Sequence, residues 1–178
     1  MGAALAAIRS VPVGPFSTET IDFDSTDASP VIRAMAGLVA RGDGLGWINI
    51  GPGLRDDQIE KLPPPPSATM LGRWFSGRGP AVPMATWTPS RGRSARALPT
   101  VGVEHGAGPK ALDRLAAAGA PLPAGWRKVQ DHAKNGIVAQ PISGASHYEV
   151  LEWLLSACWA LCPVAIEDRW MALVHRPG

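Results

Sequence analysis

Residues 146–161 constrain the fold most strongly, because they predict a helix that is apolar on nearly every side. Ser146 is the predicted N-cap, Pro163 ends the helix, and Glu149 and Glu152 mark its only charged edge. A helix with so little polar surface has to be covered over most of its circumference. We therefore expect a layered fold around this helix. The side chains expected in its core are Trp153, Leu154, Cys158 and Trp159.

The rest of the chain predicts short strands and a few further helices. Asn135-Gly136 lies between two strand-like runs and is a strong local signal for a β-hairpin. A second hairpin is expected where residues 167–169 separate two apolar runs. Strands are expected at 46–50, 84–88, 100–105, 126–132, 137–142, 164–166 and 170–174, helices at 30–41 (capped by Ser29), 56–62 and 109–118, and irregular structure at 1–28. The predicted fold class is α+β: an antiparallel or mixed sheet built from hairpins and covered by two to three helices.

A chain of 178 residues suits one domain. Four consecutive prolines at 63–66 favour a stiff, extended spacer and divide an acidic N-terminal unit from the rest. We expect residues 1–62, with one helix and one strand, to pack on an α+β core formed by residues 67–178. Together the two parts are expected to form a single compact domain.

Charge is distributed very unevenly along the chain. Residues 1–60 contain eight acids and four bases, residues 61–103 contain six bases and no acid, and residues 104–178 contain seven of each. A basic segment within a chain of net charge +2 points to an acidic partner, either an acidic protein or a small anionic ligand. The alternative is internal neutralisation, in which the arginines of the segment pair with N-terminal carboxylates. Those carboxylates would be Asp22, Asp24, Asp27, Asp56 and Asp57.

The first functional hypothesis is a non-enzymatic binding or regulatory domain that uses this basic segment for recognition. Arg73 stands beside Trp74, and Trp87 precedes three further arginines. Arginine with an aromatic side chain is the combination that holds phosphates and stacks bases, so a nucleic-acid-binding module is another alternative. The predicted anion-binding residues are Arg73, Arg91, Arg93, Arg96, Gly106 and Gly108, and the predicted aromatic contacts are Trp74 and Trp87.

A small hydrolase or transferase acting on an anionic substrate is the competing hypothesis. Its site would be the turn 104–109, where a strand ends, Gly106 and Gly108 follow, and a helix begins. Backbone N–H groups at a helix start can bind an anion, and Glu104 and His105 would supply acid–base catalysis. The alternative is that the glycines only form the turn. The spacing matches neither a dinucleotide-binding fingerprint nor a P-loop.

No cofactor and no metal site is expected. Cys158 and Cys162 share one helix face, but no Cys or His pair elsewhere completes a zinc set, so both are expected to be reduced interior thiols. The most apolar stretch, 153–166, is interrupted by Pro163 and is shorter than the roughly 20 residues of a membrane span. We therefore expect a cytoplasmic protein without membrane contact. No sequence signal indicates the oligomeric state.

Short motifs between residues 125 and 177 resemble small uncharacterised proteins of high-GC actinobacteria. The motifs are Gly125-Trp126, Gln130-Asp131-His132, Gly136-Ile137-Val138, Glu152-Trp153-Leu154-Leu155 and Arg169-Trp170. The resemblance covers less than a third of the chain and implies no activity, cofactor or site.

Overall fold

The computed structural model describes residues 9–13, 16–62, 79–91 and 97–178. The strands are β1 (Arg9–Val13), β2 (Phe16–Phe23), β3 (Trp47–Pro52), β4 (Met84–Thr88), β5 (Thr100–Glu104), β6 (Arg127–His132), β7 (Gly136–Gln140) and β8 (Trp170–Pro177). The helices are α1 (Ser29–Arg41), α2 (Asp56–Ile59), α4 (Ala111–Ala117) and α5 (His147–Leu161).

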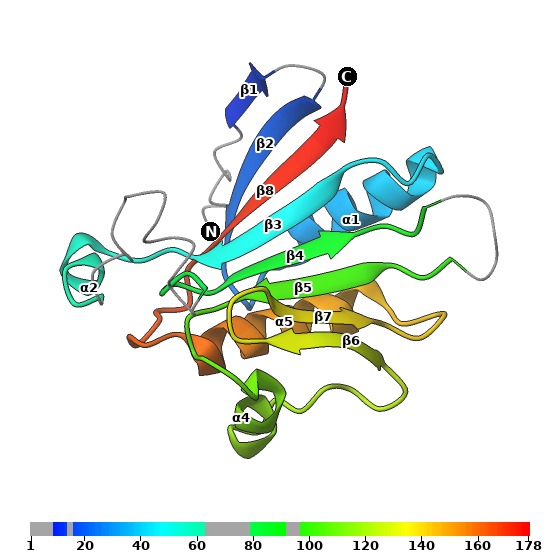
Figure 1. The fold of residues 1–178 in the computed structure, drawn as a ribbon. Helices are drawn as coiled ribbons and strands as arrows, with labels where there is room; N and C mark the ends of the chain where they lie inside the picture. Colours follow the sequence, from blue (N-terminus) through cyan, green and yellow to red (C-terminus); the bar gives the residue numbers. More distant parts are fainter. Residues whose placement is uncertain (1–8, 14–15, 63–78, 92–96) are drawn as a thin grey trace, which may run out of the picture.

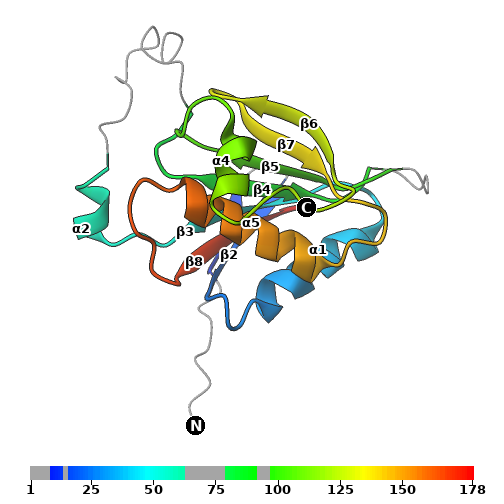
Figure 2. The same ribbon diagram turned by 90° about the horizontal axis from the view of Figure 1, so that it is seen from below.

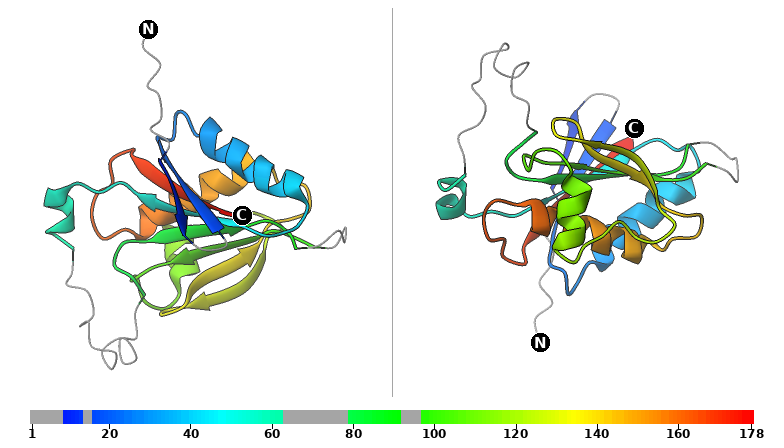
Figure 3. Two further views of the ribbon diagram at one scale, coloured as in Figure 1. Left: turned by 90° about the horizontal axis from the view of Figure 1, so that it is seen from above. Right: turned by 60° about the horizontal axis from the view of Figure 1, so that its bottom comes forward.

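All eight strands form one antiparallel sheet in the order β1-β2-β8-β3-β4-β5-β7-β6 (Figure 1). Helices α1 and α5 lie side by side behind this sheet, and α4 packs against α5 near β6 and β7 (Figures 2 and 3). The predicted α+β class, with an antiparallel sheet covered by helices, is confirmed.

Helix α5 begins and ends where its sequence predicts. The Ser146 Oγ accepts a hydrogen bond from the Glu149 N–H at 3.1 Å, and the Glu149 carboxylate accepts one from the Ser146 N–H at 2.8 Å. This capping box fixes the first turn, and Pro163 follows the last turn. The core positions Trp153, Leu154 and Cys158 are buried as predicted.

The prediction that Trp159 is buried is wrong, because 49% of its surface is exposed. Tyr148, Glu152 and Trp159 lie on the outer side of α5, away from the sheet, and all three are exposed. The sequence of α5 is apolar on this side too, so its hydrophobic pattern does not distinguish the covered side from the open one.

The elements with local sequence signals are also confirmed. Strand β4 has the predicted bounds, and β6 and β7 form the predicted hairpin. Its turn is residues 133–135, and Gly136, the first residue of β7, pairs with His132 and takes a φ of 74°. Helix α1 starts at Ser29, so Ala28 rather than Ser29 is the N-cap. Gly42 ends α1 in the left-handed conformation, as expected of a helix stop.

Two predictions near the ends of the chain are wrong. Residues 9–13 and 16–23 do not form irregular structure but strands β1 and β2, and β2 pairs along its whole length with β8. Residues 164–166 do not form a hairpin with the last strand, because β8 lies between β2 and β3 and has both edges occupied. The errors at β2 and β8 have the same cause. Strand β8 pairs with β2 and β3, which are far away in sequence, so no local turn signal marks this pairing.

Strands from both predicted units share the sheet. Residues 1–62 contribute β1, β2 and β3, and β8 from the C-terminal part separates β2 from β3. The four prolines at 63–66 that were predicted to divide the units lie outside the described residues.

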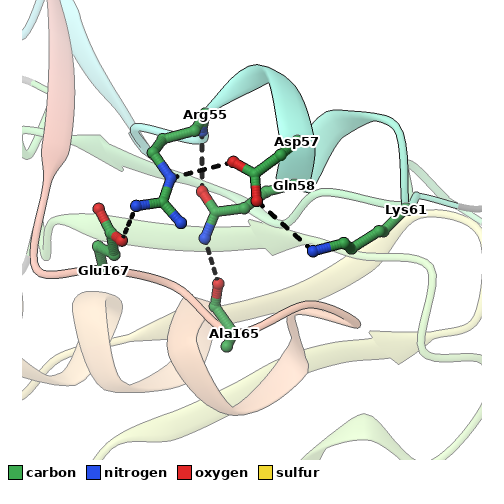
Figure 4. Close-up of polar contacts among 6 residues, drawn as sticks. All are labelled: Arg55, Asp57, Gln58, Lys61, Ala165 and Glu167. Atoms are coloured by element: carbon green, nitrogen blue, oxygen red, sulfur yellow. Dashed lines mark hydrogen bonds and ion pairs between the residues drawn. The ribbon is translucent and has the colours of Figure 1, made fainter.

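Helix α2 contacts the loop that precedes β8 through polar side chains (Figure 4). Arg55 forms an ion pair with Glu167 across this contact. The Gln58 amide accepts a hydrogen bond from the Arg55 N–H at 2.8 Å and donates one to the Ala165 carbonyl at 2.7 Å. Gln58 is consequently buried although it is polar.

Alternation along the strands gives the sheet two different faces. One face is apolar and packs against α1 and α5. It carries Ile48, Ile50, Ala85, Trp87, Ala172 and Val174, each at most 1% exposed. The opposite face, which carries Trp47, Asn49, Thr86 and His175, is covered by no described helix (Figure 1). We call it the open face.

Candidate functional site

The predicted recognition surface is described only in part. Arg73, Trp74, Arg93 and Arg96 lie outside the described residues. Arg91 is described, and its side chain is exposed.

Internal neutralisation of the basic segment occurs at one described position. Lys61 Nζ lies 3.5 Å from the Asp57 carboxylate, one helical turn away, and Arg55 Nε contacts the same carboxylate at 3.0 Å (Figure 4). Exposed pairs of this kind contribute little to stability. Arg91 forms no ion pair with any residue of the described ranges.

Trp87 lies in the core, which is incompatible with its predicted role as an aromatic contact. Only 1% of its surface is exposed, and its ring meets His147 edge-on with centroids 5.7 Å apart. Trp87 alternates along β4 with Thr86 and Thr88, and it occupies the side of the strand that faces the helices. A side chain without exposed surface cannot stack on a ligand.

Glu104 and His105 are not brought together. Successive residues at the end of β5 point to opposite sides, so Glu104 is exposed while His105 has no exposed surface. A general acid or base has to reach its substrate. The enclosed imidazole of His105 does not meet this requirement.

The environment of His105 is nevertheless unusual. Neither ring nitrogen has a hydrogen-bond partner in the described structure. Burial lowers the pKa of His105, the Asp131 carboxylate opposes this effect, and Arg114 adds to it. Asp131 is itself engaged, because its carboxylate accepts hydrogen bonds from the first two N–H groups of α4 at 3.2 and 3.3 Å. The lowered pKa favours the neutral imidazole form of His105.

Gly106 and Gly108 shape the turn before α4. A Cβ on Gly106 would lie 2.9 Å from the Pro80 carbonyl oxygen, so the chain's own backbone fills the space that a ligand would need. Gly108 takes a φ of 84°, a conformation that favours glycine. This geometry fits the alternative in which the glycines only form the turn.

A row of residues crosses the open face from β2 to β6. It follows from the strand register, in which Thr18 pairs with His175 and His175 pairs with Trp47. If the β3–β4 and β5–β7 registers are continued by one residue beyond their last pairs, the row consists, in order across the sheet, of Thr18, His175, Trp47, Thr88, Thr100, Gln140 and Arg127. Adjacent strands are about 4.8 Å apart, which places Trp47 and Arg127 at a separation of roughly 19 Å.

Two arginines line a hollow at the β6 end of this row. The hollow measures about 510 Å³, and among the described residues that line it only Arg91 and Arg127 are charged. Arg127 is oriented by two hydrogen bonds, from Nε and Nη2, to the Gln140 side-chain oxygen. Arg91 is placed by backbone packing, since a Cβ on Gly44 would lie 2.6 Å from the Arg91 Cα. We call this feature the arginine hollow.

An aromatic stack lies beside the hollow along the same row. The rings of Trp47 and His175 are nearly parallel, at 20°, with centroids 4.5 Å apart. Phe16 packs against Trp47 at a centroid distance of 5.1 Å. All three side chains are partly exposed. The open face thus combines flat rings with guanidinium groups.

Hydrogen bonds hold His175 in one protonation state. Thr86 Oγ1 donates to Asn49 Oδ1 at 3.0 Å, so the Asn49 amide nitrogen faces His175 Nε2 and donates to it at 3.3 Å. The Nε2 atom therefore accepts, and Nδ1–H donates to Thr18 Oγ1 at 3.0 Å. A proton on Nε2 would remove the bond from Asn49. Burial also lowers the pKa of His175, which favours the same neutral form.

Sequence reasoning missed Trp47, His175 and Arg127 as members of this surface. The alternation of 46–50 contained a usable signal, because it places Trp47 opposite the buried Ile48 and Ile50. His175 lacked one, since its strand was expected to end at residue 174. Arg127 became relevant only through the register that connects it to the other strands.

Comparison with protein-family models, curated proteins and solved structures found no match for this chain. The described ranges contain no cluster of three or more His, Cys, Asp or Glu side chains placed to hold a metal ion. In the same ranges, no helix combines the length and the apolar character needed to cross a bilayer.

Proposed function

We propose that this protein is a non-enzymatic binding domain that recognises an acidic partner on the open face of its sheet. The observation that carries the proposal is the arginine hollow, where Arg91 of the basic segment and Arg127 of β6 line one cavity whose described lining contains no acidic residue. The guanidinium group suits this role because it binds carboxylate or phosphate oxygens through two parallel N–H donors.

The proposal is tested by measuring the binding of the full chain to heparin, a polyanion that contains no nucleobases. Arg91→Ala and Arg127→Ala should each weaken heparin binding several-fold, and the affinity of the unmodified protein should fall steeply with salt. Arg33→Ala removes the same charge from an exposed position on α1 and serves as the control. Equal loss in all three variants would indicate unspecific attraction to net charge and would overturn the proposal.

Single-stranded nucleic acid is a second candidate for the acidic partner. It is favoured by the stack of Phe16, Trp47 and His175 beside the arginine hollow, since aromatic rings on an open sheet bind unstacked bases in single-strand-binding modules. Trp47→Ala should then weaken the binding of a labelled oligothymidylate by about 5-fold or more and leave heparin binding nearly unchanged. If Trp47→Ala weakens the binding of both ligands equally, the aromatic stack does not recognise bases, and the acidic partner is then a protein or a small anion.

The competing proposal of a hydrolase or transferase at 104–109 has less support. It would require Glu104 and His105 to act on one substrate, and they point to opposite sides of β5.

We also propose a cytoplasmic location. Both cysteines are free, and burial raises the pKa of Cys158 to about 12, so this thiol is protonated and suited to a reducing compartment.

A further inference from the structure

A second cavity lies on the helix side of the molecule, over the outer side of α5. It measures about 350 Å³ and is bordered by the loop before α1 and by the start of β8. The residues that matter for its chemistry are Ser25, Tyr148, Glu152, Trp159, Asp168 and Trp170. We call it the α5 cleft.

The α5 cleft presents large aromatic side chains to solvent. Tyr148 is 57% and Trp159 49% exposed, although both stand in a helix whose other large residues are almost all buried. Trp170 lies beneath Trp159, with ring centroids 6.3 Å apart. Exposed apolar surface gathered in one cavity is typical of a binding surface rather than of ordinary solvent-facing helix.

The charges of the cleft are negative and uncompensated. Glu152 makes no hydrogen bond or ion pair with any described residue, and no lysine or arginine is among the described residues that line the cavity. Asp168 is held rigidly by three neutral donors: the Ser25 N–H at 3.0 Å, the Ser25 hydroxyl at 2.6 Å and the Trp170 indole N–H at 3.1 Å. These bonds orient the carboxylate without neutralising its charge.

The dimensions of the cleft point to an extended ligand. Tyr148 and Trp159 are eleven positions apart on α5, which corresponds to roughly 16 Å along the helix axis. An extended peptide covers this distance with about five residues. A small ion would reach only one of the two aromatic side chains.

We propose that the α5 cleft binds an extended segment of a protein partner that carries arginine or lysine. Glu152 and Asp168 attract the cationic groups, while Tyr148 and Trp159 contact the apolar stems and offer their ring faces to the cations. This site is separate from the arginine hollow in position and opposite to it in charge, and it does not depend on the proposed function of the open face.

The probe is a fluorescent decapeptide in which arginine alternates with leucine, and its control replaces arginine with citrulline, which has the same shape without the charge. We expect the arginine peptide to bind the full chain at least about 10-fold more tightly than the citrulline peptide by fluorescence anisotropy. The protein's own net charge of +2 opposes unspecific attraction to this peptide.

Variants localise the binding. Glu152→Gln should weaken it about 2–5-fold and Trp159→Ala about 5-fold or more. Glu60→Gln, the same change at another exposed position, should leave it unchanged. Arg127→Ala should not weaken peptide binding, and Glu152→Gln should not weaken heparin binding. Equal affinity for both peptides, or arginine-peptide binding that survives Glu152→Gln and Trp159→Ala, would overturn the proposal without affecting the arginine hollow.

Discussion

The open face and the α5 cleft lie on different sides of the sheet and carry opposite charge. The open face offers Arg91 and Arg127 beside stacked rings, and the α5 cleft offers Glu152 and Asp168 beside exposed rings. Three of these four charged residues come from the charge-balanced part of the sequence, residues 104–178, and only Arg91 comes from the basic segment. Charge separation in this molecule is therefore produced mainly by the fold, and only in part by the order of charges along the chain.

We expect the largest effect from the core between the open face and the α5 cleft, because both surfaces depend on it. Trp153 is 5% exposed, packs against Trp126 at a centroid distance of 5.3 Å, and donates a hydrogen bond to the Pro121 carbonyl at 3.1 Å. Trp153→Ala should lower the free energy of unfolding by about 3–5 kcal/mol, measured by urea denaturation. If the loss is below 1 kcal/mol, α5 is not the anchor shared by the two surfaces.

The second prediction concerns pH. Burial lowers the pKa of His105 below its ordinary value of 6.5, so protonation favours the unfolded chain. The associated stability is fully present above pH 6.5 and is lost as pH falls from 6.5 toward the folded-state pKa.

His105→Leu should reduce this loss of stability between pH 7 and pH 5. At pH 7.5 the variant should be as stable as the unmodified protein, or more stable by about 1–3 kcal/mol, because two unsatisfied buried nitrogens are removed. Thermal unfolding at several pH values measures both effects. His147 and His175, whose pKa values burial also lowers, account for the remaining slope. An unchanged pH profile would show that His105 is not the sensitive group.

The third prediction tests whether a change on the open face leaves the α5 cleft intact. Asn49→Ala removes one hydrogen bond from His175 and one from Thr86 on the open face. It should cost about 1 kcal/mol and disturb the aromatic stack, while binding of the arginine peptide at the α5 cleft should persist. Parallel loss of both binding activities would indicate that the two surfaces are coupled through the sheet.

The smallest expected effect on stability is that of Trp159→Ala. The residue is half exposed, so its replacement should change the free energy of unfolding by less than about 1 kcal/mol, several-fold less than Trp153→Ala on the same helix. Chemical denaturation of both variants measures the contrast. Similar losses would mean that Trp159 supports the fold and does not serve recognition.

The parts of the fold that sequence predicted correctly are those with local signals. Ser146 is the N-cap of α5, β6 and β7 form a hairpin at Asn135-Gly136, and α1 ends at Arg41. Strands β2 and β8 were missed or mispaired because their hydrogen-bond partners are far away along the chain.

The candidate sites followed the same rule. Arg91 was predicted from local composition, and it does line a hollow. Its companion Arg127 and the neighbouring Trp47 became visible only once the register of β3 to β7 was known. The α5 cleft was missed because apolar residues occur on every side of α5, so the sequence could not show which side the fold leaves open.

The position of β8 between β2 and β3 has a consequence for the order of folding. Phe16 pairs with Pro177 and Trp47 pairs with His175, so these ladders close only when chain segments distant in sequence meet. Pairing of this kind is slow to form. During synthesis on the ribosome, β2 and β3 would each emerge with an unoccupied edge and keep it until β8 is released from the exit tunnel. In that interval they are the strands most open to pairing with another nascent chain.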